Sequence, residues 1–249
     1  MPKCSLCLSE VKSLVKSHIY PRALNQREGQ AASTLAVVAR NARPQKSPTG
    51  VYERFLCQSC EDSFNPCDTH FVNFVRDVEN REQRLDQRFE DPLAWIFPEE
   101  LARPRLLRLF ANSLLLRAHL TSQPFFRKVQ LGPHYERLRA LVLSDDPGGD
   151  DEFAVLLIRQ KGVTGQIANE PTTIKQGGVN AYCLAPPGLR LVVKVDKRPF
   201  PALYREYQIR LEQPVFAIRR HQVQEELDEI RRITHPYKDN ISRILKTNP

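Results

Sequence analysis

The chain has 249 residues, of which 41% are hydrophobic and 27% charged, and it carries a net charge of +8 with a pI near 9.3. This composition is typical of a globular protein and excludes a disordered chain, and the lack of an apolar run of about 18 residues excludes a membrane-spanning helix. The excess of positive charge favours a polyanionic partner, of which a nucleic acid, DNA or RNA, is one.

Most of the positive charge lies near the N-terminus. Residues 1–50 contain eight Lys or Arg against two Glu, a net charge of +6. An anionic membrane surface would also attract this segment, but no lipidation signal accompanies it. The first ten residues, MPKCSLCLSE, lack the apolar core of a signal peptide, so we expect a cytoplasmic protein. Thiols stay reduced in the cytoplasm, which favours metal binding over disulfides for closely spaced cysteines.

The first segment, residues 1–80, is predicted to contain two strands, a loop and a helix. Apolar and polar side chains alternate over residues 11–17, as is typical of a strand. Turn-forming residues fill positions 41–50 and predict a loop, after which residues 51–56 form a second strand. Apolar residues then recur at helical spacing from residue 58 to about residue 77, which predicts a helix in which Pro66 is tolerable only near the start or at a kink.

Residues 81–249 are predicted to form a companion region of helices and one antiparallel sheet. A leucine-rich run ending at Leu120 predicts a largely buried helix, and residues 135–143 predict an amphipathic one. Acidic and glycine residues between 144 and 152 predict a turn. Apolar runs predict three strands, and charged runs near the C-terminus two helices: residues 153–159, 180–184 and 189–195, then 222–233 and 240–245. The predicted fold class is therefore α+β.

Four of the six cysteines form two CxxC pairs that predict a zinc site. Cys4 and Cys7 make one pair, Cys57 and Cys60 the other, and 49 residues separate the pairs. Each CxxC turn presents two thiolates to one ion, so two turns complete a tetrahedral shell. The ion would join two distant pieces of chain, which predicts a structural zinc. Free thiols or a redox pair are the alternative, and Cys67 is a further candidate ligand at a less suitable spacing.

The sequence around these cysteines resembles the zinc-stapled HNH endonucleases, whose ββα-metal fold is a hairpin followed by a helix. The sequence SHIYP occupies residues 17–21, at the end of the first predicted strand, and FLCQSCE occupies residues 55–61, at the helix start. In that family a CxxC precedes a strand that ends in His followed by Ile or Val, any residue and Pro, and an LCxxC opens the helix. The resemblance covers residues 1–70.

The resemblance implies a metal-dependent endonuclease that hydrolyses phosphodiester bonds in DNA. His18 would be the general base that activates a water, and a divalent ion, Mg²⁺ or Mn²⁺, would stabilise charge on the phosphate. Glu61 and Asn65 match the helix ligands of the family by position. A spacing of four places them on one helix face, and both offer the oxygen ligands that Mg²⁺ prefers. By analogy with the family, such a module belongs to restriction or phage-defence systems.

Two positions depart from the family pattern and support another interpretation. Ser17 stands where the family usually has Asp, Glu or His before its base, and Tyr52 stands in the place of the Asn that orients the base. They favour a non-catalytic zinc-ribbon protein that docks on nucleic acid. In that case His18 would hydrogen-bond a loop and Asn65 would be a cap residue. Glu61 would be an acidic residue in the first turn of the helix, where the helix dipole stabilises negative charge.

A third interpretation makes the zinc-bound segment a protein-interaction element with no nucleic-acid role. Outside that segment, residues 194–198 and 219–221 are the best candidates for phosphate contacts.

Overall fold

The computed structural model describes residues 1–25, 35–38, 45–47, 50–84, 94–160, 167–176 and 178–220. The helices predicted at 222–233 and 240–245 lie outside the described residues. Within the described part of the chain, no helix combines the length and the apolar character needed to cross a bilayer.

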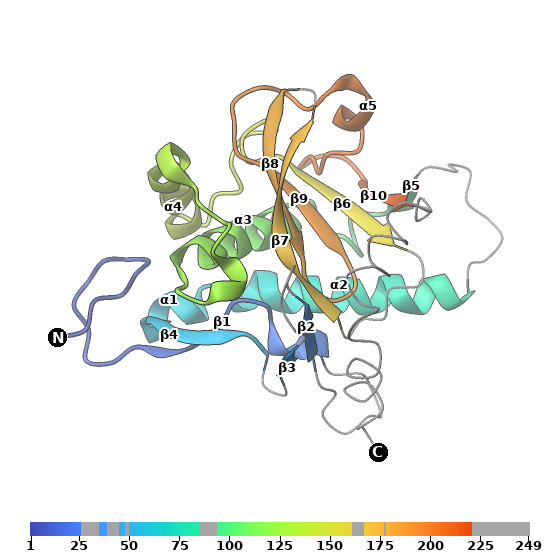
Figure 1. Cartoon of the computed structure of the whole chain (residues 1–249). Coiled ribbons are helices and arrows are strands. Elements are labelled where there is room, and N and C mark those ends of the chain that lie inside the picture. Colours follow the sequence, from blue (N-terminus) through green and yellow to red (C-terminus); the bar gives the residue numbers. More distant parts are fainter. Residues whose placement is uncertain are drawn as a thin grey trace, which may run out of the picture.

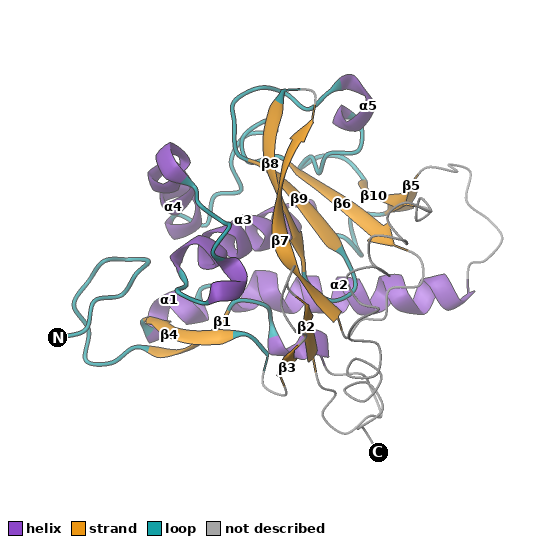
Figure 2. Ribbon diagram, viewed as in Figure 1, coloured by secondary structure: helices purple, strands orange, loops and turns teal. Residues whose placement is uncertain are grey.

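The described strands form two sheets (Figures 1 and 2). The smaller one pairs β1 (Val15–His18) with β4 (Tyr52–Leu56) in antiparallel orientation. The larger one has eight described strands in the order β3-β2-β7-β8-β9-β6-β10-β5. In chain order its strands are β2 (Leu35–Val38), β3 (Gln45–Ser47), β5 (Ala94–Phe97), β6 (Val155–Gln160), β7 (Ile167–Gln176), β8 (Val179–Ala185), β9 (Arg190–Lys194) and β10 (Val215–Arg220).

The larger sheet is mixed, so the prediction of a purely antiparallel sheet is wrong. The strands predicted at 153–159, 180–184 and 189–195 are confirmed as β6, β8 and β9, and they pair in antiparallel orientation. However, β10 runs parallel to β6, and β2 runs parallel to β7. These parallel pairs join strands that are distant in the chain, which a local pattern cannot reveal. The loop predicted at 41–50 is likewise corrected, because β3 lies within it.

The described helices are α1 (Gln58–Asp62), α2 (Asn65–Arg84), α3 (Pro104–Leu120), α4 (Tyr135–Leu143) and the short α5 (Ala202–Arg205). The predicted amphipathic helix at 135–143 is confirmed as α4, and the leucine-rich helix is confirmed as α3, which is buried along almost its whole length. Helix α2 runs along one end of the larger sheet, beneath it in the view of Figure 1. Single 3₁₀ turns occur at Arg22–Asn25, Pro124–Phe126 and Gly132–His134.

Besides a second, smaller cluster that includes Leu156, Val192 and Phe200, a large hydrophobic core joins the two sheets and helices α1 to α4. It extends from Cys4 to Ala217 in the sequence. Helices α2 and α3 meet where the rings of Phe71 and Phe110 stack at a centroid distance of 3.8 Å. The boundary expected near residue 80 falls within α2, and two strands of residues 1–80 belong to the larger sheet. The division into domains 1–80 and 81–249 stays a prediction.

Candidate metal centre and adjoining polar site

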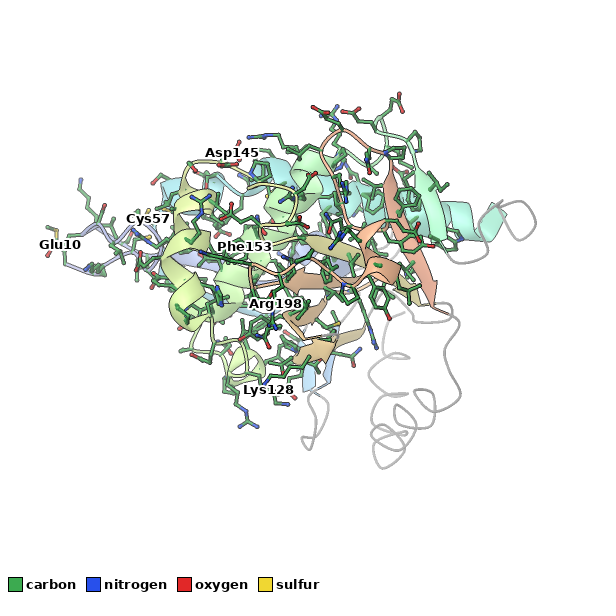
Figure 3. The ribbon with its side chains drawn as sticks, turned by 90° about the horizontal axis from the view of Figure 1, so that it is seen from above. Glu10, Cys57, Lys128, Asp145, Phe153 and Arg198 are labelled. Carbon is green, nitrogen blue, oxygen red and sulfur yellow. The ribbon has the colours of Figure 1, made fainter. Side chains whose placement is uncertain are left out.

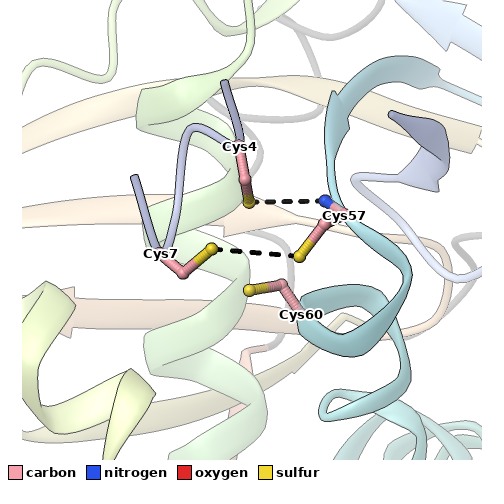
Figure 4. Close-up of side chains that lie close together, drawn as sticks. All are labelled: Cys4, Cys7, Cys57 and Cys60. Atoms are coloured by element: carbon pink, nitrogen blue, oxygen red, sulfur yellow. Dashed lines mark hydrogen bonds between the residues drawn. The ribbon is translucent and has the colours of Figure 1, made fainter. Parts of the chain in front are cut away.

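The four cysteines of the two CxxC pairs converge, as predicted. The Sγ atoms of Cys4, Cys7, Cys57 and Cys60 all lie within 4.8 Å of one another (Figure 4). The Sγ atoms of Cys7 and Cys57 are 3.9 Å apart. A tetrahedral zinc with Zn–S bonds of about 2.3 Å separates its sulfurs by roughly 3.8 Å, so the thiols fit such an ion. The cluster can therefore hold a structural metal ion such as zinc.

Hydrogen bonds lower the pKa of Cys7 and Cys57 and favour the thiolate form that binds metal, whereas burial raises the pKa of Cys60. The backbone N–H of Cys57 donates to Sγ of Cys4 at 3.3 Å, and Oγ of Ser59 lies 3.2 Å from Sγ of Cys57. Hydrogen bonds from the side chain and the backbone of Ser9 lower the pKa of Cys7 to about 6. Donors aimed at sulfur stabilise negative charge there, as a set of metal ligands requires.

The residue that follows the first CxxC turn has the left-handed conformation. Leu8 has a φ of 64°. The N–H of Leu8 donates to the carbonyl oxygen of Cys4 at 2.9 Å. The N–H of Cys4 donates to the carbonyl oxygen of Ser9 at 3.0 Å. The left-handed residue lets the chain reverse and brings Ser9 to Cys7. A side chain with a Cβ makes this conformation unfavourable by about 1–2 kcal/mol.

We predict that Leu8→Gly stabilises the folded protein by roughly 0.5 kcal/mol. The substitution removes the steric penalty of the left-handed conformation, and the greater freedom of Gly in the unfolded chain offsets part of the gain. Urea denaturation measures the change. The control is Leu6→Gly, which removes a side chain that is 1% exposed and should destabilise the protein by 2 kcal/mol or more, by the cavity term of about 2–5 kcal/mol. A lower stability of Leu8→Gly would contradict the prediction.

Hydrogen bonds of the two residues between Cys4 and Cys7 bind the N-terminal segment to β4 and α4. The N–H of Ser5 donates to the carbonyl oxygen of Phe55 on β4 at 2.9 Å. Nε of Arg139, on α4, donates to the carbonyl oxygen of Leu6 at 2.6 Å. Figure 3 shows Glu10 and Cys57 at one end of the molecule. The cluster thus forms a corner at which β4 and α4 are tied to the first residues of the chain.

Cys67, the further candidate ligand, lies apart from the cluster. It sits on α2, where its Sγ donates to the carbonyl oxygen of Phe64 at 3.2 Å. Burial raises the pKa of Cys67 to about 12, which keeps the thiol neutral. A neutral, buried thiol is a core residue and a poor metal ligand.

The end of β1 lies beside the start of α1. Side chains alternate along the strand, so that Ser17 is fully buried on one side and the ring of His18 lies on the other, 5.7 Å from the ring of Tyr52. Burial raises the pKa of the Glu61 carboxyl, whereas hydrogen bonds from the Ser17 hydroxyl and the His18 backbone N–H act in the opposite direction. Oε2 of Glu61 is buried and has no hydrogen-bond partner among the described residues. The Ser17 side chain and the His18 backbone therefore meet Glu61, whereas the His18 ring lies on the other face of the strand, against Tyr52.

Asn65 does not share a helix with Glu61. Helix α1 ends at Asp62 and α2 begins at Asn65, so the prediction that the two residues share one helix face is wrong. Pro66 has no backbone N–H, which is tolerated only in the first turn of a helix, and it is the second residue of α2. Asn65 is exposed at this restart, where the alternative reading expected a cap residue.

A buried arginine that the sequence analysis missed reaches the same site. Nη1 of Arg117, on α3, donates to the carbonyl oxygen of His18 and to Oδ2 of Asp68, each at 2.9 Å. Nη2 donates to Oδ1 of Asp68 at 2.7 Å. The side chain is 1% exposed, and its charge opposes the effect of burial, which raises the pKa of Glu61. A fixed cation therefore joins the end of β1 to α2.

The leucine-rich pattern of α3 concealed this arginine. A signal was nevertheless present, because an Arg within a largely buried helix has to be paired with an acceptor. Arg108 on the same helix obeys the same rule, since Nη2 donates to the carbonyl oxygens of Gly149 and Glu152.

The expected phosphate contact at Lys194 is wrong. Its side chain is fully buried, and its ammonium donates to the carbonyl oxygens of Asp151, Asp196 and Arg198. Three carbonyls use all three donors of the ammonium, so none remains for a phosphate. Of the other candidate stretch, residues 219–221, His221 lies outside the described residues.

Comparisons of the chain with protein-family models, with curated proteins and with solved structures give no match.

Proposed function

We propose that the N-terminal part of the chain is a zinc-stapled, HNH-like endonuclease module that hydrolyses phosphodiester bonds in DNA. The observation that carries the proposal is the convergence of the two CxxC pairs, which holds the end of β1 against the start of α1. The order of strand, strand and helix agrees with the resemblance. Ser17 contacts Glu61, as expected of the position before the base, and His18 lies against Tyr52, which occupies the place of the orienting Asn.

The residues at the strand end fit the roles proposed for them. His18 would accept the proton of the attacking water on its imidazole, and Tyr52 would hold the ring through contact between the two rings. Glu61 offers a buried carboxylate oxygen without a hydrogen-bond partner among the described residues, and oxygen is the ligand type that Mg²⁺ prefers. When bound, Mg²⁺ or Mn²⁺ supplies charge stabilisation at the scissile phosphate. Asn65 stays a ligand expected from the resemblance alone, because it begins α2 and does not share a helix face with Glu61.

We predict that the zinc-loaded protein nicks supercoiled plasmid in Mg²⁺ or Mn²⁺ and that His18→Ala lowers the rate at least 100-fold. General bases typically contribute a factor of about 10²–10⁴ to a rate. Glu61→Gln should lower it similarly by weakening the metal site. The control is His134→Ala, which removes a histidine from the turn before α4. Undiminished cutting by His18→Ala would reject the base, and a folded, zinc-loaded protein that cuts in neither ion would reject the nuclease.

A second function, nucleic-acid binding without cleavage, is favoured by the Arg117–Asp68 pair. The guanidinium already supplies a positive charge beside Glu61, where the resemblance expects a divalent cation. Ser17 adds only a hydroxyl to that position. Binding that weakens with salt, without any cutting, would favour this function. Absence of binding at low salt would favour a protein-interaction element instead.

A further inference from the structure

The outer face of the β1–β4 pair carries a basic and aromatic strip made of Lys16, Tyr52 and Arg54. The strand register places Lys16 opposite Arg54 and His18 opposite Tyr52. Directly opposed residues of an antiparallel pair share a face, and the next residue on each strand points the other way. The strip therefore lies on the same face as the ring of His18.

The opposite face of the β1–β4 pair points toward the interior of the protein. Ser17 is fully buried there. Its register partner Glu53 accepts hydrogen bonds from Oγ1 of Thr121 at 2.5 Å and from the N–H and Oγ of Ser122 at 2.8 and 2.7 Å, beyond the end of α3. The carboxylate nearest to the strip in sequence thus points away from it and is satisfied. The strip keeps its positive charge.

All three residues of the strip are exposed, and Tyr52 is 37% exposed. Nζ of Lys16 lies 3.6 Å from the centroid of the Tyr52 ring, and Nη1 of Arg54 donates to the carbonyl oxygen of Leu14 at 3.2 Å. Neither cation forms an ion pair with a carboxylate of the described residues. The charge of both is therefore available to an anionic partner, and the flexible stem of Lys16 lets it leave the ring.

We propose that this strip binds a single-stranded nucleic-acid segment and guides it to His18, an inference that rests on the proposed function and specifies its substrate. Two cations beside an exposed aromatic ring match what an unpaired strand presents, since phosphates take the cations and a base stacks on the ring. A paired base inside a duplex offers no free face to Tyr52. The phosphate next to a stacked base would then lie beside the imidazole that shares this face.

The test measures binding of fluorescein-labelled DNA of about 20 nucleotides to the full-length, zinc-loaded protein, since single-strand sites span roughly 4–16 nucleotides. The Glu61→Gln background prevents cutting during the titration. We expect the single strand to bind more tightly than the same sequence as a duplex. Tyr52→Ala should weaken single-strand binding about tenfold, within the range for loss of one stacked base, and affect duplex binding less.

Lys16→Ala and Arg54→Ala should weaken binding of both forms and each reduce the salt slope by about one. Tyr52→Phe keeps the ring and should bind like the parent, which separates loss of stacking from misfolding. Arg205→Ala removes an exposed cation on α5, outside the β1–β4 pair, and should change nothing. Circular dichroism and zinc content verify that each variant is folded.

Unchanged single-strand binding by Tyr52→Ala, or tighter binding of the duplex, would overturn the inference. So would binding to anionic phospholipid vesicles but not to DNA. Failure of the nuclease gives a different result. In that case the wild-type protein cuts nothing, while single-strand binding still depends on Tyr52, Lys16 and Arg54.

Discussion

Cys57→Ser is expected to abolish stoichiometric zinc binding and to unfold the first 80 residues. Apparent binding free energies of structural zinc are about 10–16 kcal/mol at neutral pH, as large as the whole stability of an ordinary domain. The sulfur of Cys57 lies 3.9 Å from that of Cys7 and within 4.8 Å of that of Cys4, both in the other CxxC pair. Its loss therefore affects both CxxC turns. Cys4→Ser should have the same effect.

Metal analysis of the purified protein and thermal denaturation with and without a chelator measure this effect. The matched control is Cys67→Ser, because Cys67 is also buried but lies outside the cluster. The control should keep one zinc per chain. A folded Cys57→Ser protein with an unchanged melting temperature, or a folded wild-type protein without zinc, would contradict the assignment.

The thiol cluster could be predicted because the sequence signal for it, the CxxC spacing, lies within four consecutive residues. Each CxxC pair is a short turn whose two sulfurs point the same way, so only the meeting of the two turns had to be inferred. The neighbourhood of His18 and Glu61 followed, since each is close in sequence to a cysteine pair. Arg117 could not be placed in this way, because 99 residues separate it from His18 and only tertiary packing joins them.

Asp68→Asn is expected to destabilise the protein by about 3 kcal/mol or more. Removing one partner of a buried ion pair leaves an uncompensated charge, which typically destabilises by 3–5 kcal/mol. Arg117 is 1% exposed and Asp68 19%. Burial disfavours the charged guanidinium, but the carboxylate of Asp68 outweighs this effect and raises the pKa of Arg117. An arginine stays protonated at any ordinary pH, so the guanidinium keeps its charge when Asp68 is neutralised.

Urea denaturation of a double-mutant cycle measures the pair. Arg117→Met alone should also destabilise the protein, and Arg117→Met with Asp68→Leu should be more stable than the sum of the single effects predicts. The matched control is Asp145→Asn, which breaks the Arg105–Asp145 pair at 2.6 Å, whose side chains are 51% and 68% exposed. Exposed pairs contribute less than about 1 kcal/mol. Equal losses at Asp68 and Asp145 would contradict the role of burial.

The limits of strand prediction have a physical cause too. The strands β6, β8 and β9 were evident because continuous apolar runs are typical of strands covered on both faces. Strand β7 contains Glu170 and Pro171, which argue against a central strand. The structure accommodates them by a register shift between Asn169 and Thr172, where the missing N–H of proline breaks no regular pairing. The short β2, β3 and β5 acquire their partners only in the folded sheet.

The packing of α2 has a practical consequence for expressing residues 1–80, which contain the four clustered cysteines, as a separate fragment. Phe71 stacks on Phe110, and Phe74 meets Phe97 at a centroid distance of 5.1 Å. A fragment that ends at residue 80 would expose the rings of Phe71 and Phe74 to water and would also separate β2 from β7. Such a fragment should aggregate, so the cysteine-containing segment has to be expressed together with the rest of the chain.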